Sequence, residues 1–364
     1  MVLNRDKIRR IGVFKFRNIG DVLMITPALR ALREAFPDAE ITVAVNSVTD
    51  AMLANNPHIN RVLVYDRKTK ERNLFSRLKR EFLFFRKLRQ MRFDLTVDFT
   101  SGDRPVAYSL LSGARVRTAF AGPWNRLNWR RLAFTHLFPN PPPPIHEVER
   151  HLWLLKQLGI PARDKSLCLV TSESDRAWAK NLIAPYSGKT IVHVHPVARW
   201  LFKCWDNQKM AEVIDWLELE KNAKVIITSS TTPKELDRTR AILGLCRSQP
   251  LFLNGQTTLG QVAALSEAAD LFFGVDTAPM HMAAAVGTPV VCLFGPTNAD
   301  SWHPWSDQQM TLQKACPCQK SGERECDWSV VRACLQNIQP AEVKAALEPM
   351  LKTIRTAPMS SKMV

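Results

Sequence analysis

The sequence lacks an uninterrupted apolar run of the roughly 20 residues that a transmembrane helix requires. This absence argues against a membrane-spanning helix. Residues 1–10 are charged, and Lys15 and Arg17 interrupt the apolar stretch behind them, so the pattern also lacks an export signal. We therefore expect a cytoplasmic protein.

Acidic residues are scarce relative to basic ones. The chain has 364 residues, with 34 Asp and Glu against 50 Lys and Arg, which gives a formal net charge of +16. A field of this sign attracts nucleic acid, anionic lipid or another polyanion, and composition alone does not distinguish these partners. The length and the hydrophobic content of 46% favour two domains, each with its own core.

Metal-binding patterns are also sparse. Four of the eight cysteines lie together at Cys316, Cys318, Cys326 and Cys334. Their spacing is not that of a tight zinc ribbon, although four thiols in one segment could close a tetrahedral site. Reduced structural thiols are the favoured interpretation in a cytosolic chain. No Asp-x-Asp signature lies near the candidate loops described below, so we expect neither a metal nor a cofactor.

Strand and helix patterns alternate along the chain and predict an α/β fold. In the N-terminal part, strands alternate with helices, and the first helix is predicted over 22–35. Consecutive prolines at 141–144 precede a helix over 146–158. The C-terminal part has helices over 208–220, 234–243 and 260–268. Buried-strand patterns occur at 11–16, 41–45, 61–64, 95–99, 190–195, 224–228, 251–253, 271–275 and 290–294.

This order predicts two Rossmann-like, doubly wound domains with parallel sheets. We expect them at 1–165 and 166–340, followed by a C-terminal helix over 341–352 and a frayed tail. Ligands in such folds bind at the carboxyl ends of the strands, so we expect an active cleft between the two domains.

The stretch from Leu271 to Asn298 contains the most informative loop. A strand over 271–275 breaks into Asp276-Thr277-Ala278-Pro279, and a helix pattern resumes at Met280 and His281. A helix N-terminus presents unpaired N–H groups and a positive dipole end, and proline fits its first turn. The loop therefore predicts a phosphate-binding site.

Three further positions follow predicted strands. Asp21 lies where the first strand turns into a helix, and it is placed either for chemistry or simply to cap that helix. Arg199 and Lys203 could neutralise a diphosphate, or form a solvated pair beside an aromatic anchor. Glu235 lies where such folds place an acid on ribose, or simply in the first turn of a helix.

The stretch 67–92 carries eleven basic and two acidic residues. Apolar residues recur at helical spacing among them, which indicates an amphipathic, cationic helix suited to an anionic membrane surface or a phosphorylated lipid acceptor. A solvated face over ordinary core contacts and a nucleic-acid site are the alternatives. For membrane or acceptor binding we single out Arg77, Lys79, Arg80, Arg86 and Lys87.

Several motifs together carry a family resemblance. They are GVFKFRNIGDVLMITPAL at 12–29, RWLFKCW at 199–205, GVDTAPMHMAAA at 274–285 and FGPT at 294–297. The chain resembles glycosyltransferase family 9, the ADP-heptose:lipopolysaccharide heptosyltransferases, from about Ile11 to Leu347. The APMHM variant and WHPW at 302–305 are most similar to the lipopolysaccharide core heptosyltransferase III subgroup.

The resemblance implies a GT-B fold with the acceptor on the first domain and ADP-heptose on the second. Asp21 matches the family's proposed general base, Lys203 its phosphate-binding lysine, and Glu235 matches only loosely. The family's donor loop corresponds to Asp276, Thr277, Ala278 and His281, with Pro279 and Met280 between them, and the amides of 277–280 would face the diphosphate.

These observations predict an inverting heptosyltransferase that acts on the inner core of lipopolysaccharide. We expect it to lie peripherally at the cytoplasmic face of the inner membrane and not to bind nucleic acid. The alternatives are another GT-B enzyme on a nucleotide sugar, such as a hexosyltransferase or an epimerase, and a noncatalytic basic protein that binds anionic lipid or nucleic acid.

Overall fold

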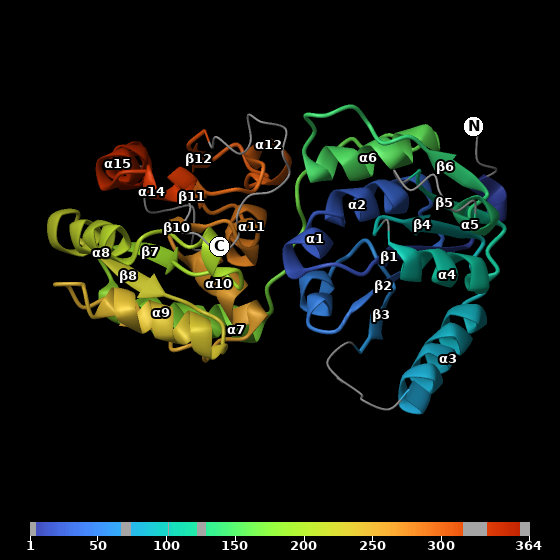
Figure 1. Cartoon of the computed structure of the whole chain (residues 1–364), viewed down its shortest axis with the longest axis horizontal. Coiled ribbons are helices and arrows are strands. Elements are labelled where there is room, and N and C mark those ends of the chain that lie inside the picture. Colours follow the sequence, from blue (N-terminus) through green and yellow to red (C-terminus); the bar gives the residue numbers. More distant parts are fainter. Residues whose placement is uncertain (1–4, 67–73, 101, 122–128, 316–332, 357–364) are drawn as a thin grey trace. The chain divides into compact units, whose positions relative to one another are not determined.

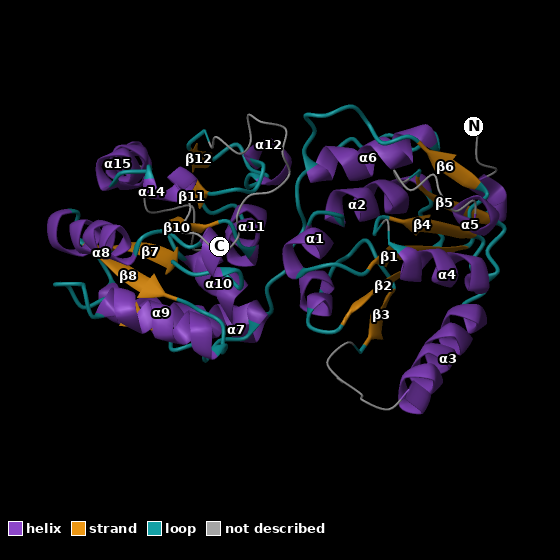
Figure 2. Cartoon of the chain, in the orientation of Figure 1, coloured by secondary structure: helices purple, strands orange, loops and turns teal. Residues whose placement is uncertain are grey.

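The computed structural model describes residues 5–66, 74–100, 102–121, 129–315 and 333–356 (Figure 1). The chain divides into two compact units, Met1–Val170 and Thr171–Val364. Each unit is built on one six-stranded sheet whose strands are all parallel. Helices lie on both sides of the strands in each unit, as Figure 2 shows. None of the helices in the described part of the chain combines the length and apolarity needed to cross a membrane.

The first sheet has the strand order β3-β2-β1-β4-β5-β6. Its strands are β1 (Arg10–Lys15), β2 (Glu40–Asn46), β3 (Arg61–Tyr65), β4 (Leu95–Asp98), β5 (Val116–Phe120) and β6 (His136–Phe138). The four strands predicted in this part are confirmed, whereas β5 and β6 were not predicted. Nearly continuous burial along β1, β2 and β4 is typical of parallel strands covered on both faces.

The helices of the first unit follow its strands along the chain in a βαβ order. They are α1 (Ile19–Leu23), α2 (Thr26–Ala35), α3 (Leu74–Gln90), α4 (Asp103–Ser112), α5 (Trp129–Ala133) and α6 (Glu147–Gln157), with 3-10 turns η1 (Arg5–Lys7) and η2 (Thr49–Leu53). The structure divides the single helix predicted over 22–35 into α1 and α2. Pro27 has no N–H for the Leu23 carbonyl, which instead accepts a 2.8 Å hydrogen bond from the Thr26 hydroxyl.

Alternation along β1 directs its side chains to two different faces. Phe14 and Phe16 pack in an aromatic cluster that includes Tyr65, Phe84 of α3 and Tyr108 of α4. Lys15, between the two phenylalanines, therefore points to the opposite face of the sheet.

The second sheet has the strand order β12-β11-β10-β7-β8-β9. Its strands are β7 (Thr190–His195), β8 (Ala223–Ile227), β9 (Leu251–Phe252), β10 (Leu271–Val275), β11 (Val290–Phe294) and β12 (Gln309–Gln313). The five strands predicted here are confirmed within one residue at each end, and β12 is an addition at the edge.

The helices of the second unit confirm the three predicted between its strands and add others. They are α7 (Glu173–Ile183), α8 (Asn207–Asp215), α9 (Pro233–Leu243), α10 (Leu259–Ala268), α11 (Ala278–Ala285), α12 (Ala299–Trp302), α14 (Ala333–Gln336) and α15 (Pro340–Thr356), with short turns η3 (Ala184–Tyr186), η4 (Leu201–Lys203) and a π-helical turn η5 (Trp216–Glu220). The predicted C-terminal helix is α15, and its Val343, Leu347 and Leu351 are buried in the core of this unit. The tail after residue 356 lies outside the described residues.

Candidate active site

The loop after β1 occupies the switch point of the first sheet. The strand order turns outward in two directions between β1 and β4, and ligands of open α/β sheets bind outside the carboxyl ends of such neighbouring strands. Asp21 lies in this loop, at the third position of the short helix α1. The loop is tied to the end of β4, because Phe16 N donates to the Thr100 hydroxyl and Arg17 donates twice to the Thr100 carbonyl.

Asp21 has one oxygen in a helix cap and one near a cation. Its Oδ2 accepts hydrogen bonds of 3.3 Å from both the backbone N–H and the side-chain amide of Asn18, so the capping interpretation describes a real contact. Its Oδ1 lies 3.7 Å from Lys15 Nζ. The side chain is 14% exposed, so part of the carboxylate is open to a substrate while the rest is held.

Lys15 is a buried lysine held by three partners. Its ammonium donates to the Phe99 carbonyl at 3.2 Å and approaches His151 Nε2 at 3.0 Å and Asp21 Oδ1 at 3.7 Å. The other ring nitrogen, His151 Nδ1, lies 3.3 Å from the Met24 carbonyl, which can only accept. His151 therefore carries its proton on Nδ1 and accepts from Lys15 through Nε2.

Burial lowers the pKa values of both Lys15 and His151. Desolvation lowers the pKa of Lys15, and the nearby Asp21 carboxylate counteracts part of that effect. Desolvation and the Lys15 charge hold the pKa of His151 well below its usual range. A neutral imidazole beside an ammonium and a carboxylate fixes the position of the Lys15 charge behind Asp21.

The predicted strand, turn and helix around Asp276 are confirmed in the second unit. β10 ends at Val275, Thr277 has an extended backbone at the N-cap, and α11 begins at Ala278 with Pro279 in its first turn. Thr277 and Ala278 are half-buried, whereas Met280 and His281 are buried. The part of the loop that a ligand can reach is therefore the backbone at the start of α11.

Lys203 and Asp276 form an ion pair. Lys203 Nζ donates to Asp276 Oδ2 at 2.6 Å, and the Asp276 side chain is 7% exposed. The sequence assigned both residues to the donor site without predicting their contact. The pair holds the Lys203 ammonium, which has two further N–H groups, beside the N-terminus of α11.

Arg199 does not join this pair. It is exposed, and its guanidinium lies over the ring of Trp200 at 5.5 Å from the centroid. The loop behind it is fixed to the core, because Trp205 is buried and donates to the Ile338 carbonyl, and Ala198 N donates to Cys204 Sγ. Within the described part of the chain, Arg199 makes no ion pair.

Glu235 lies in the first turn of α9 and is nearly completely buried. Its carboxylate accepts from Ser230 N at 3.3 Å and from the Thr232 hydroxyl at 3.1 Å. These contacts shape the loop that follows β8. They match the alternative that Glu235 lies simply in the first turn of a helix, and a contact between Glu235 and ribose stays a prediction.

Two histidines that sequence patterns did not identify lie beside this loop. His193 and His195 point to the same face of β7 and share the Thr228 hydroxyl, at 2.7 and 2.8 Å, and His193 also contacts Ser266 Oγ at 2.8 Å. Burial lowers the pKa of His193 to about 3 and that of His195 to about 4. Both imidazoles are therefore neutral in the folded protein at ordinary pH.

The basic residues predicted for membrane or acceptor binding lie on α3, although they do not share one face. Lys79, Arg86 and Lys87 are exposed, whereas Arg80 packs over the ring of Tyr65. The side chain of Arg77 and the stretch 67–73 lie outside the described residues. Among the interleaved apolar residues, Leu88 is buried and Leu78 and Phe82 are exposed.

The cysteine cluster is described only at Cys334, which is buried in α14; Cys316, Cys318 and Cys326 lie outside the described residues. In the part of the chain that the structure describes, no group of three or more His, Cys, Asp or Glu side chains is placed to hold a metal ion.

Lys15 is the functional residue that sequence patterns could have identified. A lysine inside an otherwise apolar, buried strand needs a partner, and that anomaly is visible in the sequence. His151 lies 136 positions away along the chain, and nothing in its own segment indicates the contact.

Comparisons with known proteins found similar sequences and similar folds. The model of glycosyltransferase family 9 (heptosyltransferase) matches residues 82–331. Lipopolysaccharide heptosyltransferase 3 of Escherichia coli is 31% identical over 345 residues, which cover 93% of this chain and 98% of that protein. A family 9 glycosyltransferase from Veillonella parvula superposes with a TM-score of 0.83 at 21% identity, over 97% of this chain and 99% of that one. An Escherichia coli heptosyltransferase with ADP gives 0.71 at 20% identity, over 94% and 99%.

Proposed function

Because this chain belongs to glycosyltransferase family 9, the heptosyltransferases, we propose that it transfers heptose from ADP-L-glycero-D-manno-heptose to the inner core of lipopolysaccharide. The observation that carries the choice of substrates is the 31% identity with lipopolysaccharide heptosyltransferase 3, which extends over nearly all of both chains. The chain is a glycosyltransferase with the GT-B fold of two Rossmann-like domains.

Asp21 is the proposed general base. Its carboxylate takes the proton from an acceptor hydroxyl as the hydroxyl oxygen attacks the anomeric carbon of the heptose. The bond from that carbon to the diphosphate breaks on the opposite side, and its electron pair leaves on the phosphate oxygen as ADP. One such displacement inverts the anomeric centre. Lys15, whose ammonium lies 3.7 Å behind the carboxylate, supports this role by holding Asp21 Oδ1 in place through an ion pair.

The start of α11 and Lys203 are the proposed site for the departing diphosphate. The backbone N–H groups of Thr277 and Ala278 lie at the N-terminus of α11, where developing negative charge is stabilised without a metal ion. Pro279 has no N–H, and Met280 N donates to the Thr277 carbonyl at 3.1 Å, so these two positions of the loop offer no amide to the diphosphate. Lys203 supplies a full positive charge beside them, and Asp276 holds that lysine in place. Arg199 is exposed in the loop after β7 that also carries Lys203, and it is proposed as a second cation for the phosphates.

The buried donor-loop residues have supporting roles in this proposal. Met280 and His281 are buried residues of α11 itself and fix the position of its first turn. Glu235 orders the loop after β8 through Ser230 and Thr232, and this loop is where the nucleoside would lie in a doubly wound sheet.

We further propose that the enzyme works peripherally at the cytoplasmic face of the inner membrane, because its acceptor is a lipid. The basic, exposed residues of α3, including Lys79, Arg86 and Lys87, support contact with an anionic surface. With a lipid acceptor, the anionic membrane surface explains the net positive charge, and we do not propose nucleic acid as a partner.

An assay of ADP release tests the reaction. Wild-type protein mixed with ADP-heptose and a detergent-dispersed, core-truncated lipopolysaccharide should release ADP, and mass and linkage analysis should show one added heptose. No turnover with a panel of core-truncated acceptors would refute the substrate assignment. Turnover with a different nucleotide sugar would identify another GT-B activity.

The variant Asp21→Asn distinguishes the proposed general-base role of Asp21 from its role in capping helix α1. Its amide oxygen can still accept the Asn18 N–H, so the helix cap is kept, but it cannot take up a proton. We expect kcat to fall by roughly 100-fold or more with little change in Tm. Asp38→Asn, the same substitution at an exposed position after α2, is the matched control and should behave as wild type. An Asp21→Asn enzyme as active as the control would leave Asp21 with the cap alone.

A further inference from the structure

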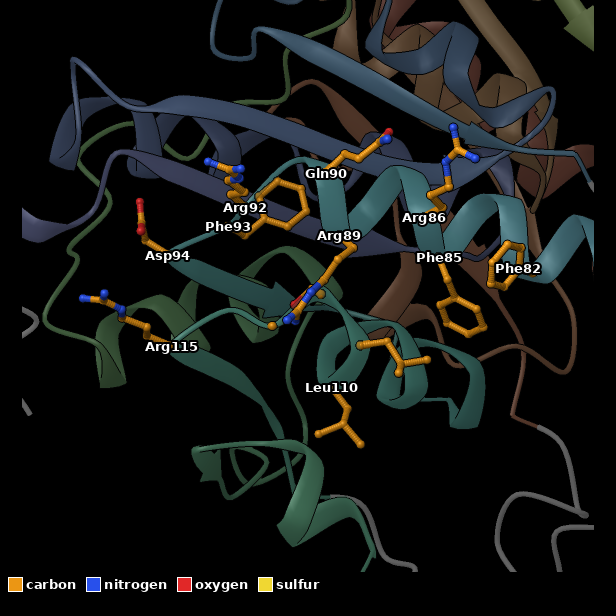
Figure 3. A pocket seen from close by; sticks show the side chains of 13 residues that line it. Phe82, Phe85, Arg86, Arg89, Gln90, Arg92, Phe93, Asp94, Leu110 and Arg115 are labelled. Carbon is orange, nitrogen blue, oxygen red and sulfur yellow. The ribbon is translucent and has the colours of Figure 1, made fainter.

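A groove lies between the C-terminal ends of α3 and α4, and we propose that it binds the headgroup phosphate of an anionic phospholipid and docks the first unit on the bilayer (Figure 3). This inference rests on the proposed function only in so far as a lipid acceptor brings the enzyme to a membrane. It names a specific site where composition indicated only a general attraction to polyanions.

The groove has a volume of about 960 Å³ and a cationic lining. Four arginines line it: Arg86 and Arg89 on α3, Arg92 just after this helix, and Arg115 just before β5. Figure 3 shows Arg89 in the middle of the groove, between α3 and Leu110 of α4. Its guanidinium rests on Gly113, where a Cβ atom would lie 1.8 Å from Arg89 Nη1.

The positive charge of the groove is not neutralised by its own lining. Asp94 is the one acidic residue among the lining side chains, and its Oδ2 accepts 2.9 Å hydrogen bonds from the backbone N–H groups of Arg9 and Arg10. Within the described part of the chain, none of the four lining arginines forms an ion pair. The groove therefore offers several guanidinium donors to an anion, and phosphate accepts such donors in pairs.

Exposed apolar side chains adjoin these arginines. Phe82 of α3 is 65% exposed, and Leu110 and Leu111 of α4 are each 45% exposed. Leu78, one helical turn before Phe82, is also exposed and continues the strip along α3. Apolar surface beside cations matches the boundary of an anionic bilayer, where acyl chains lie next to phosphates. A free phosphate or a nucleic acid would leave the apolar strip in water.

The groove is not the site of sugar transfer. Arg92 and Asp94 precede β4, and Gly113 and Arg115 precede β5, so they lie at the amino ends of these parallel strands. Asp21 follows the carboxyl end of β1, so it lies at the opposite end of the parallel strands. Helix α3 connects the two ends, because it follows the carboxyl end of β3 and stops before the amino end of β4. A lipid in the groove would hold α3 along the membrane surface.

Vesicle binding by the full chain tests the proposal. We compare phosphatidylcholine vesicles with equimolar phosphatidylcholine and phosphatidylglycerol at near-physiological salt, using co-sedimentation without donor or acceptor. We expect binding only to the mixed vesicles, weakened roughly tenfold or more by Arg89→Gln with Arg115→Gln. Lys156→Gln with Arg163→Gln removes the same charge from exposed positions on and after α6 and should change binding less than twofold.

Two further variants separate the groove from general charge and from misfolding. Phe82→Ser with Leu110→Ser keeps every charge and should weaken binding to the same mixed vesicles severalfold. Arg92→Gly removes a groove cation at a residue with φ +50°, where glycine is favoured, so it should weaken binding without lowering Tm. Equal losses from the groove pair and the control pair, or equal binding to neutral vesicles, would overturn the proposal. Intact vesicle binding without ADP release would refute only the proposed reaction.

Discussion

At the residue scale, a few buried polar side chains surround the proposed base Asp21. Lys15 is the clearest, because its ammonium is desolvated and yet faces a carbonyl, a neutral imidazole and the carboxylate of Asp21. Such a group is retained in a strand only where its partners are placed by the whole unit. We therefore propose Lys15 as a positioning residue for Asp21.

Replacing Lys15 by Met tests that role. Methionine has a similar volume, so we expect a small change in Tm, a fall in kcat of roughly tenfold or more, and little change in donor KM. A variant with unchanged kcat would reduce Lys15 to a structural residue.

Lys203 offers a second test at this scale. Lys203→Met removes the ammonium beside α11 and should raise the donor KM by roughly 10- to 100-fold, the loss expected for a charge-assisted hydrogen bond. Lys180→Met, on the exposed face of α7, is the matched control. Steady-state kinetics at saturating acceptor measures the difference. Equal KM values in the two variants would remove Lys203 from the donor site.

Helix α3 is the amphipathic helix that the sequence predicted, but some of its apolar residues are exposed rather than packed inward. Apolar residues recur along it at helical spacing, which predicted an amphipathic helix. The side that packs into the unit carries Phe84 and Leu88, and the apolar side chains of Leu78 and Phe82 are exposed instead. Basic residues occur on most of the helix surface, so charge alone did not mark the outward face.

The two faces of α3 predict different stabilities for the same substitution. Phe84→Ala should lower the free energy of unfolding by about 3–5 kcal/mol, because this side chain is 5% exposed within the aromatic cluster. Phe82→Ala, two residues earlier and largely exposed, should change it by less than about 0.5 kcal/mol. Urea unfolding of both variants measures the contrast. Similar losses would mean that the opposite face of α3 packs inward.

At the scale of the whole molecule, the chain is two α/β units with separate cores. The second unit buries two neutral histidines on the central strand β7, and their pKa values are lowered to about 3 and about 4 by desolvation. In the unfolded chain both groups would titrate near 6.5. Between pH 6.5 and about 4 the unfolded state therefore binds more protons than the folded state.

This difference predicts that the second unit loses stability as the pH falls through that window. Each histidine should cost on the order of 3 kcal/mol by pH 4, and the loss should begin near pH 6.5. Denaturant unfolding followed by tryptophan fluorescence at pH 7.5 and pH 4.5 measures it. In His193→Gln, residue 193 cannot take up a proton, so the free energy of unfolding should depend less steeply on pH. An unfolding midpoint that does not change with pH would contradict the lowered pKa values of the two histidines.

The sequence predicted the parallel strands well, because runs such as Leu271–Val275 and Val290–Phe294 are apolar throughout and are buried on both faces. It did not predict β5, β6 and β12, which are edge or near-edge strands with polar residues and weaker patterns. It located Asp21, Lys203 and Asp276, because each follows a recognisable strand. It did not locate His151 or Arg115, because their significance depends on partners far away in sequence.

The sequence by itself determined the fold class, the family and the loops that carry the proposed donor and base residues, because these follow from local periodicity and from short motifs. Only the tertiary structure decided which partners those residues have: Lys15 and Asn18 around Asp21, Asp276 against Lys203, and four arginines around one groove. The physical reason is that burial and electrostatic pairing depend on three-dimensional distance, which a one-dimensional pattern does not contain.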